Sequence, residues 1–511
     1  PVTLLFGPAV SYAVLMVLAM FFTAFSWYYM LSRHLLGRGA GAVLGGLFCG
    51  FAPGMVAQSN GHPNLVAQFL VPLLVWRAVR LREPGRWLRN GIVLGLLTIW
   101  QAFINEEILF VTALAFGLFL LVYGLRRKAE IRAALRPGLR GLGVAALIAA
   151  VVLAYPLYFQ FFGPQAYHGM FNGNRNFGAD ITSFAYFSSH SILGSSLTSG
   201  HFAQNASEEN SFYGWPLLVL IGALVWWLRR NVAVLALAVV AVVFAVLSFG
   251  ARLFWHGTHT RIPGPFAALS HVPIFDNIVP TRLALVIIPV FGILLAYGYQ
   301  QVMTALRGQG PAASSGLPRV LWFAVLVAAL VPIVPRPLPV AVKTPTPEFI
   351  TSGQWHRYIT PGHSLVTVPT ASSKYIQPIF WSAGTMLDLP VARGYFLVPT
   401  VDPKHPNDKR ATFGAPRAEF QYLTDSALKT GKVPKIGPAD RASALDDLKH
   451  WNASIVILQR IPDDQAKFSG ILPPVPGGFA ALYATTTQIL GFPPTYTGGV
   501  FLWDVRAITG G

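Results

Sequence analysis

Charged residues are scarce in this chain: they make up 11% of its 511 residues, whereas hydrophobic residues make up 53%. A soluble globular protein carries about 25% charged residues. We therefore infer that lipid, rather than water, solvates much of the surface. The net charge of +18 falls in short clusters between apolar runs. This pattern is typical of membrane topology signals, so we expect no nucleic-acid partner.

Cysteine is almost absent, because Cys49 is the only one and lies inside an apolar run. A single cysteine excludes an intramolecular disulfide and a cysteine-based metal cluster. The sequence also lacks a P-loop, a glycine-rich dinucleotide fingerprint after a strand, an HExxH motif and a GxSxG motif. We therefore predict no metal site among these patterns and no certain cofactor, and leave a divalent cation as an open alternative.

Ten apolar runs approach or reach the length that a helix needs to cross a bilayer. They are residues 4–31, 40–58, 63–80, 90–105, 107–125, 141–162, 213–228, 231–250, 281–306 and 319–336. If Pro1 lies outside, the inner loops and span ends carry 17 Lys and Arg residues, and the outer ones of the membrane region carry five. Because Lys and Arg gather on the cytoplasmic side, we predict an α-helical polytopic protein of about ten transmembrane helices in the plasma (inner) membrane. This orientation requires residues 90–105 and 107–125 to be two separate spans, because a single span there would invert the topology of everything that follows.

The domain organisation follows from a change in composition after Pro339. Residues 1–340 are predicted to form the transmembrane domain, with two long outer-face loops at 163–212 and 251–280. The rest is ordinary soluble sequence with strand-like and helical patterns: strands at 363–369, 453–459 and 499–505, and a helix at 441–450. We therefore predict a soluble extracytoplasmic α/β domain over residues 341–511.

Acidic residues are the first candidates for chemistry. Six of the eight in residues 1–340 map to the predicted outer side, and ionisable groups at membrane depth are costly and often functional. Glu106 and Glu107 follow Asn105 at an outer turn, where a carboxylate can act as a general base, bind a sugar hydroxyl or hold a cation. The alternative is that one of them caps the following helix. Which of the two acts stays open.

The remaining candidates lie in other outer segments. Asn60 and His62 belong to a tight polar turn, in which imidazole can hydrogen-bond a phosphate or a sugar; the alternative is a simple turn before a helix that starts at Pro63. Arg282 lies at the outer end of a span, where it either binds phosphate bidentately or snorkels to lipid headgroups. Together with Asn105 and Arg261, these residues form the predicted substrate- and phosphate-binding set.

The sequence resembles the GT-C superfamily of integral-membrane glycosyltransferases, in particular its actinobacterial-type members. The similarity is carried by Leu5–Tyr12 (LFGPAVSY), Gly50–Pro53 with Gly61–Leu65, Gln101 with Asn105–Glu107, and Val279–Leu283. The resemblance implies a polyprenyl-phosphate-linked sugar donor, a glycan or glycolipid acceptor, and transfer on the outer face in cell wall biogenesis. In that superfamily the catalytic base is an Asp or Glu in the first outer loop. No acidic residue precedes Glu83 here. We expect that segment to lie upstream of Pro1; the alternative is that the chain departs from the pattern of the superfamily and is inactive.

The mechanism implied by the resemblance is deprotonation of an acceptor hydroxyl by a carboxylate, followed by attack on the anomeric carbon. Arg282 and His62 would stabilise the departing lipid phosphate, and whether the reaction inverts or retains configuration stays open. Two alternatives remain: a transporter or flippase for lipid-linked glycans, and a non-catalytic membrane scaffold of envelope assembly. A transporter predicts internal repeats and ionisable groups deep in the spans, whereas the sequence shows no repeat and its spans are nearly free of charge.

Overall fold

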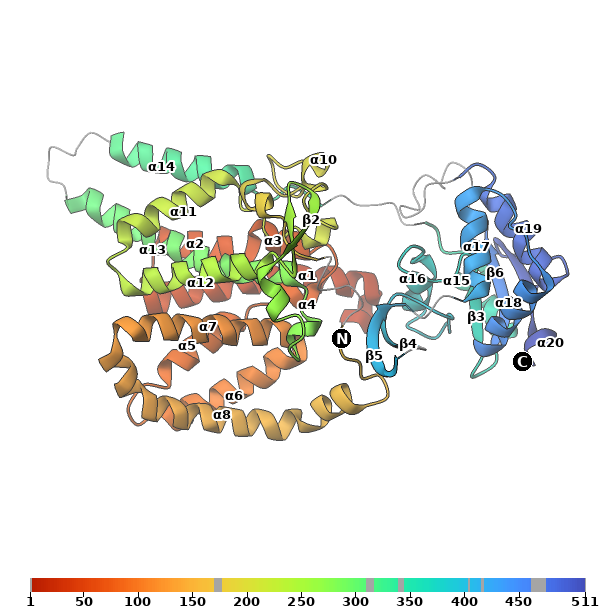
Figure 1. Cartoon of the computed structure of the whole chain (residues 1–511), viewed down its shortest axis with the longest axis horizontal. Coiled ribbons are helices and arrows are strands. Elements are labelled where there is room, and N and C mark those ends of the chain that lie inside the picture. Colours follow the sequence, from red (N-terminus) through yellow and green to blue (C-terminus); the bar gives the residue numbers. More distant parts are fainter. Residues whose placement is uncertain are drawn as a thin grey trace. The chain divides into compact units, whose positions relative to one another are not determined.

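The computed structural model describes residues 2–169, 177–308, 317–338, 344–402, 405–414, 418–460 and 475–510. The chain divides into two compact units. One is Tyr12–Leu338, and the other is Pro339–Gly511 together with Pro1–Ser11. Figure 1 shows the first unit as helices lying side by side and the second as a sheet covered by helices.

The helical unit is built from long apolar helices joined by short turns. Its helices are α1 Val2–Met30 from Tyr12 onward, α2 Ala40–Phe51, α3 Pro53–Gln58, α4 Pro63–Val66, α5 Val71–Arg80, α6 Trp87–Ile104, α7 Glu106–Arg126, α8 Lys128–Phe162, α11 Trp215–Leu228, α12 Val232–Ser248, α13 Ile287–Gly308 and α14 Leu317–Leu330. Within the described residues, six helical segments are long and apolar enough to cross a membrane: Val2–Leu35, Ala40–Gln58, Trp87–Ile104, Glu106–Arg126, Lys128–Phe162 and Pro280–Arg307. Three further apolar helices are shorter: Trp215–Leu228, Val232–Ser248 and Leu317–Ile333.

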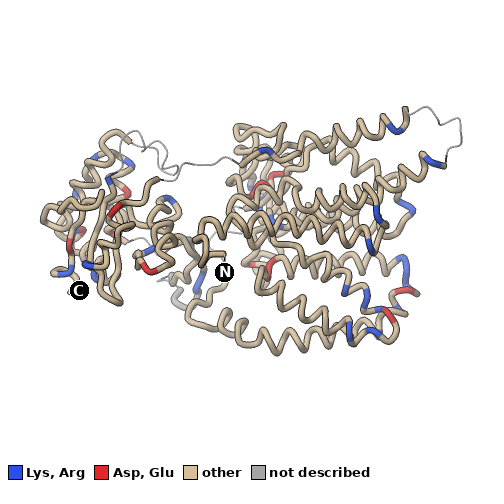
Figure 2. The backbone as a smooth tube through the Cα atoms, turned by 180° about the vertical axis from the view of Figure 1, so that it is seen from behind, with Lys and Arg blue, Asp and Glu red and all other residues tan. Residues whose placement is uncertain are grey.

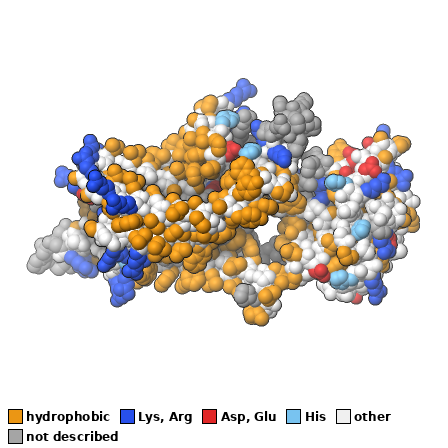
Figure 3. Space-filling model, turned by 90° about the horizontal axis from the view of Figure 1, so that it is seen from below, with side chains coloured by type: hydrophobic (Ala, Val, Ile, Leu, Met, Phe, Trp, Pro, Cys, Tyr) orange, Lys and Arg blue, Asp and Glu red, His pale blue; other side chains and the backbone are white. Residues whose placement is uncertain are grey.

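The outside of these helices is apolar. On α8, for example, Leu147, Val151 and Tyr155 are 66%, 71% and 74% exposed. Figure 3 shows apolar side chains spread over one face of the helical unit, with Lys and Arg gathered at one end. So large an apolar surface is stable in lipid and not in water. The chain is therefore a helical membrane protein with a C-terminal region that contains a sheet.

The break between 90–105 and 107–125 is present as predicted, since α6 ends at Ile104 and α7 begins at Glu106. The prediction of one continuous helix over 63–80 was wrong, because residues 67–70 separate α4 from α5. Thr23 on α1 holds this break: its Oγ1 donates to Val66 O at 2.9 Å and accepts from Gln68 N at 3.0 Å. Non-helical backbone is tolerated at membrane depth where protein satisfies its polar groups.

Small residues allow two pairs of helices to approach closely. A Cβ atom on Gly41 or Gly45 of α2 would lie 2.7 or 2.6 Å from a carbonyl oxygen of α13. A Cβ on Gly91 of α6 would lie 2.5 Å from the Gly141 oxygen of α8, and one on Gly95 would lie 3.0 Å from Ala145 O. Each pair thus uses small residues four apart, the spacing that brings membrane helices into backbone contact.

The α6–α8 contact makes a stability prediction. Gly91→Leu is expected to lower the midpoint of thermal unfolding in detergent, because overpacking costs about 1–3 kcal/mol. Gly117→Leu on α7 is the matched control, since a Cβ there meets no described atom within 4 Å. Equal shifts in the two variants would contradict the close contact between α6 and α8.

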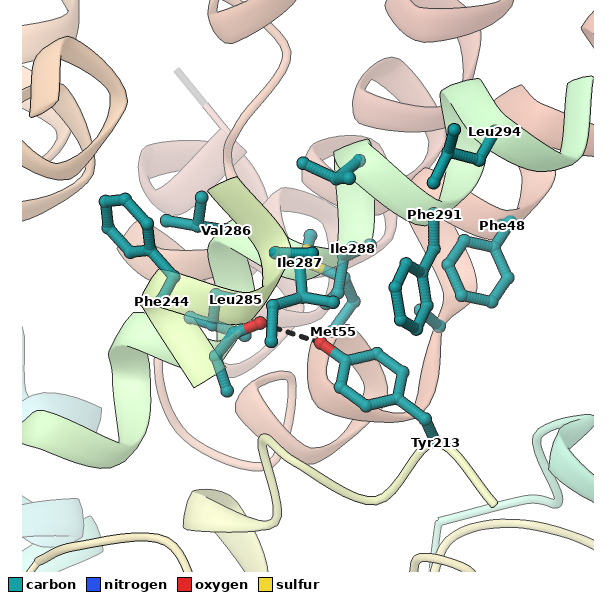
Figure 4. Close-up of a cluster of buried hydrophobic side chains, with 14 of the residues drawn as sticks. Phe48, Met55, Tyr213, Phe244, Leu285, Val286, Ile287, Ile288, Phe291 and Leu294 are labelled. Atoms are coloured by element: carbon teal, nitrogen blue, oxygen red, sulfur yellow. Dashed lines mark hydrogen bonds between the residues drawn. The ribbon is translucent and has the colours of Figure 1, made fainter. Parts of the chain in front are cut away.

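A buried cluster links the loop before α11 to the start of α13. Figure 4 shows Tyr213 packed beside Phe291, with its hydroxyl donating to the carbonyl oxygen of Ala284 at 2.7 Å. Ala284 belongs to the 3-10 helix η6, Pro280–Val286, which runs directly into α13. This hydrogen bond therefore joins the loop before α11 to η6. Each of these two segments carries charged residues.

The predicted outer loops fold into short elements rather than long helices. The described part of 163–212 contains η2 Ile181–Ala185, α10 Ser196–Ser199 and η3 Ala206–Glu208, while residues 170–176 lie outside the described residues. The segment 251–280 forms a hairpin of β1 Arg252–Trp255 and β2 Thr258–Pro263, followed by η4 Pro265–Ala268 and η5 Phe275–Asn277. After α14, the turn η8 Val331–Ile333 ends the helical unit's regular structure.

The C-terminal unit contains a four-stranded sheet in the order β3-β6-β8-β7. β3 Ser364–Thr367 pairs in parallel with β6 Ala453–Gln459, whereas β8 Val500–Asp504 pairs antiparallel with both β6 and β7 Thr495–Thr497. The helices are α15 Glu348–Thr351, α16 Gln377–Gly384, α17 Glu419–Thr430, α18 Pro438–His450, α19 Gly478–Leu490 and α20 Arg506–Thr509, and β4 Leu397–Asp402 with β5 His405–Phe413 forms a separate hairpin. The predicted strands and the helix at 441–450 are therefore confirmed.

Candidate functional site

Three charged side chains from separate parts of the helical unit meet at one point. Arg282 Nη2 lies 2.7 Å and its Nε 3.1 Å from Glu208 Oε1, and its Nη1 lies 3.3 Å from Glu107 Oε2. The Glu208 side chain is 3% exposed, and those of Arg282 and Glu107 are 20% and 21% exposed. We call Glu107, Glu208 and Arg282 the charged triad.

The start of α7 decides which of the two adjacent carboxylates joins the triad. Asn105 is the N-cap, and its Oδ1 accepts from Ile108 N at 2.8 Å. Successive residues of a helix point about 100° apart, so Glu106 and Glu107 face different ways. Glu106 is exposed and accepts from Gln160 Nε2 at 2.8 Å, whereas Glu107 faces Arg282. Asn105 thus has the structural role of a cap, and Glu107 is the candidate for chemistry.

Arg282 is held by the turn in which it lies. Its backbone N–H donates to Val279 O at 3.0 Å, and the neighbouring Thr281 N–H donates to Phe177 O at 2.9 Å. Thr281 Oγ1 also donates to the carbonyl oxygen of Glu208 at 3.4 Å. The loop that carries Glu208 and the turn that carries Arg282 are therefore joined through backbone as well as through charge.

A buried amide pair supports the carboxylate of Glu208. Asn210 Nδ2 donates to Glu208 Oε2 at 2.9 Å, and Gln58 Nε2 donates to Asn210 Oδ1 at 2.7 Å and to Glu208 Oε2 at 3.4 Å. Gln58 and Asn210 are fully buried. Buried carboxylates require such donors, so Glu208 is fixed on both oxygens.

Three buried polar atoms around this network have no hydrogen-bond partner among the described residues. These atoms are Gln58 Oε1, His62 Nδ1 and Glu107 Oε1. Most buried polar atoms in native proteins are paired, so such atoms indicate a place for water or a ligand. Glu107 thus has one oxygen on Arg282 and one oxygen available for another donor.

His62 lies near the triad, in the turn between α3 and α4. Burial lowers its pKa below the ordinary value, the positive charge of Arg282 lowers it further, and Glu208 opposes this change. The imidazole is therefore neutral at pH 7, with its Nδ1 as a hydrogen-bonding group rather than a cation. A neutral His62 can bind a hydroxyl as well as a phosphate.

The structure brings together Glu107, His62 and Arg282 from the predicted set. It places the others elsewhere: Asn60 is exposed in the α3–α4 turn, and Arg261 is exposed on β2. In the described residues, no group of three or more His, Cys, Asp or Glu side chains is arranged to hold a metal ion.

The sequence analysis left Glu208, Gln58 and Asn210 out of the predicted site. The scarcity of acids in residues 1–340 was a signal for Glu208, but Asp180 and Glu209 carry the same signal. Asp180 instead accepts from the backbone N–H of Gly257 at 2.7 Å, and Glu209 accepts from Ser188 and Ser189. These two carboxylates fix loops, and Glu208 alone of the three pairs with Arg282 in the described structure.

Comparison with known proteins adds a family. A family described as a domain of unknown function (DUF6311) matches residues 2–275, more than half of the chain. The chain belongs to this family. The matched range contains Gln58, His62, Glu107 and Glu208 of the site, and it ends shortly before Arg282. No curated protein matches the chain.

Proposed function

We propose that this DUF6311 protein is a membrane glycosyltransferase. It transfers a sugar from a polyprenyl-phosphate donor to a glycan or lipid acceptor of the cell envelope. The observation that supports this most directly is the charged triad, in which Glu107 keeps one buried oxygen without a partner in the described residues. A carboxylate in that state, held by an arginine, is suited to take a proton from an acceptor hydroxyl.

The proposal places the triad on the outer face of the plasma membrane. α7 begins with Glu106 and Glu107 and ends at Arg126, and Figure 2 shows most cations of the helical unit gathered at the opposite end from the triad. Lys and Arg in short loops mark the cytoplasmic side. The proposal therefore keeps about ten spans, outer loops and an extracytoplasmic C-terminal domain.

The chemistry assigned to each group follows from its contacts. Glu107 accepts the proton of the acceptor hydroxyl on Oε1, while Arg282 holds Oε2 and Glu208 holds Arg282. The acceptor oxygen forms a bond to the anomeric carbon as the bond from that carbon to the phosphate oxygen breaks. The electron pair of that bond leaves with the polyprenyl phosphate. His62, neutral and beside Arg282, is the group proposed to hydrogen-bond the sugar or the phosphate.

The donor class is the first thing to test. The protein in proteoliposomes is incubated with membrane glycan and with radiolabelled hexoses and pentoses linked to short-chain polyprenyl phosphate. A parallel set carries the same sugars on nucleoside diphosphates. We expect transfer to the glycan from at least one lipid-linked sugar and from none of the nucleotide sugars. Failure of every lipid-linked donor, or use of the nucleotide sugars instead, would overturn the proposal.

A further inference from the structure

The helical unit encloses a second site, unrelated to the triad's chemistry: an apolar cavity of about 430 Å³ between α1, α5, α7, α12 and α13. Its walls are almost entirely aliphatic and aromatic, with Gln68, Thr112, Asn231 and Tyr297 as the polar exceptions. An apolar cavity of about 150 Å³ is enough to hold benzene. The cavity in this protein is nearly three times that size. In a bilayer we expect a hydrocarbon chain to fill it.

The cavity is closed at the triad's end and open at the other. On α7, the lining residues Ile108 and Val111 are both 4% exposed, whereas Phe116 and Phe119 further along are half-buried. On α5, Val71 is buried and Val79 is half-buried. The segment after α1 continues the trend, because the lining residue Leu35 is 53% exposed. The mouth therefore faces the lipid at the ends of the helices remote from Glu107.

The depth of the cavity matches one leaflet. Its wall on α7 runs from Ile108 to Phe119, which at about 1.5 Å per residue is roughly 16 Å. The hydrocarbon core of a bilayer is about 30 Å thick, so one leaflet supplies about 15 Å. A single extended chain entering from the mouth would therefore fill the cavity along its length.

Arginines lie close in the chain to residues that line the mouth. Arg33 lies two residues before Leu35, and Arg230 directly precedes the lining residue Asn231. Arg126 follows Phe119 by seven residues, which places it on the same face of α7 two turns further on. All three arginines are exposed, and Figure 2 shows Lys and Arg gathered at one end of the helices. Exposed basic groups at the membrane surface attract anionic headgroups.

We propose that this cavity binds one hydrocarbon chain of an anionic membrane lipid, drawn from the leaflet on the arginine-rich side, with the headgroup on Arg33, Arg126 and Arg230. The site is separate from the sugar transfer proposed above, because the buried residues at its closed end separate it from Glu107. Lipid binding in this cavity can therefore be tested independently of the proposed sugar transfer.

The test measures lipid retained by the purified protein. The full chain is reconstituted in nanodiscs containing equal amounts of phosphatidylglycerol and phosphatidylcholine, and bound lipid is counted by native mass spectrometry after release into detergent. We expect one bound phosphatidylglycerol in the wild type. Ala115→Phe fills the cavity from α7 and is expected to lower the bound fraction about tenfold, whereas Ala113→Phe on the exposed side of the same helix leaves it unchanged. Val75→Phe blocks the same space from α5 and serves if Ala115→Phe does not fold.

A charge control identifies the headgroup site. Arg33→Gln, Arg126→Gln and Arg230→Gln together are expected to remove the preference for phosphatidylglycerol. The matched variant, with Arg132, Arg136 and Arg140 of α8 replaced by Gln, is expected to keep it, since α8 contributes no residue to the lining of the described cavity. The proposal is overturned by a wild type that retains no lipid, by equal retention in Ala115→Phe and Ala113→Phe, or by equal binding of the two phospholipids.

Discussion

Glu107→Gln is expected to lower the rate of sugar transfer by about 100- to 10,000-fold, the range that a positioned general base contributes. Glutamine has nearly the same shape and can still accept from Arg282 Nη1, which lies 3.3 Å from Glu107 Oε2. It cannot accept the proton of the acceptor hydroxyl. The measurement is the initial rate of release of polyprenyl phosphate in proteoliposomes at saturating donor.

Glu106→Gln is the matched control for this result. Glu106 is the adjacent residue and carries the same charge, but it is exposed and bonded to Gln160 on α8. A rate close to the wild-type value is expected for it. An equal loss in both variants would show that charge at the start of α7, and not the carboxylate facing Arg282, is what matters. A full rate in Glu107→Gln would remove Glu107 from the mechanism.

Much of the helical fold follows from the sequence because its determinants are local. The break between α6 and α7 was predictable from Asn105, an N-cap residue followed by two acids in the first helical turn. In the C-terminal unit, β6 alternates its side chains between two buried clusters, Val456 and Leu458 in one and Ile455 and Ile457 in the other. That continuous apolar run identifies a central strand without any tertiary information.

Features that depend on distant residues could not be predicted in the same way. The break after α4 depends on Thr23, which lies 43 residues before Val66 in the chain. The Thr23 hydroxyl donates to the backbone carbonyl oxygen of Val66 at this break. The acids in the loop before α11 look alike in the sequence, but only folding turns Glu208 to Arg282 and Glu209 to two serines. Rare charge in a membrane region thus identified Glu107 and Arg282 as candidates, while Glu208, the second acidic partner of Arg282, could be identified only from the tertiary structure.

Glu208→Gln is expected to destabilise the protein by about 3 kcal/mol, the lower end of the cost of breaking a buried ion pair by removing one partner. Glu208 accepts two hydrogen bonds from Arg282 on one oxygen, and its side chain is 3% exposed. Without its charge, the Arg282 guanidinium keeps only Glu107 as a described ionic partner. The measurement is the denaturant midpoint in detergent micelles, followed by tryptophan fluorescence.

A double-mutant cycle separates the ion pair from a general effect of mutating this loop. Removing Arg282 alone leaves the carboxylates of Glu107 and Glu208 without their shared cation, whereas the double variant leaves only that of Glu107. The variant Glu208→Gln/Arg282→Met is therefore expected to be more stable than the sum of its single variants predicts, by about 1–3 kcal/mol, as for side chains in direct contact. Strict additivity would mean that Glu208 and Arg282 are not coupled in the folded protein. In that case Arg282 would lack the support that fixes it against Glu107, and the geometry proposed for catalysis would lose its basis.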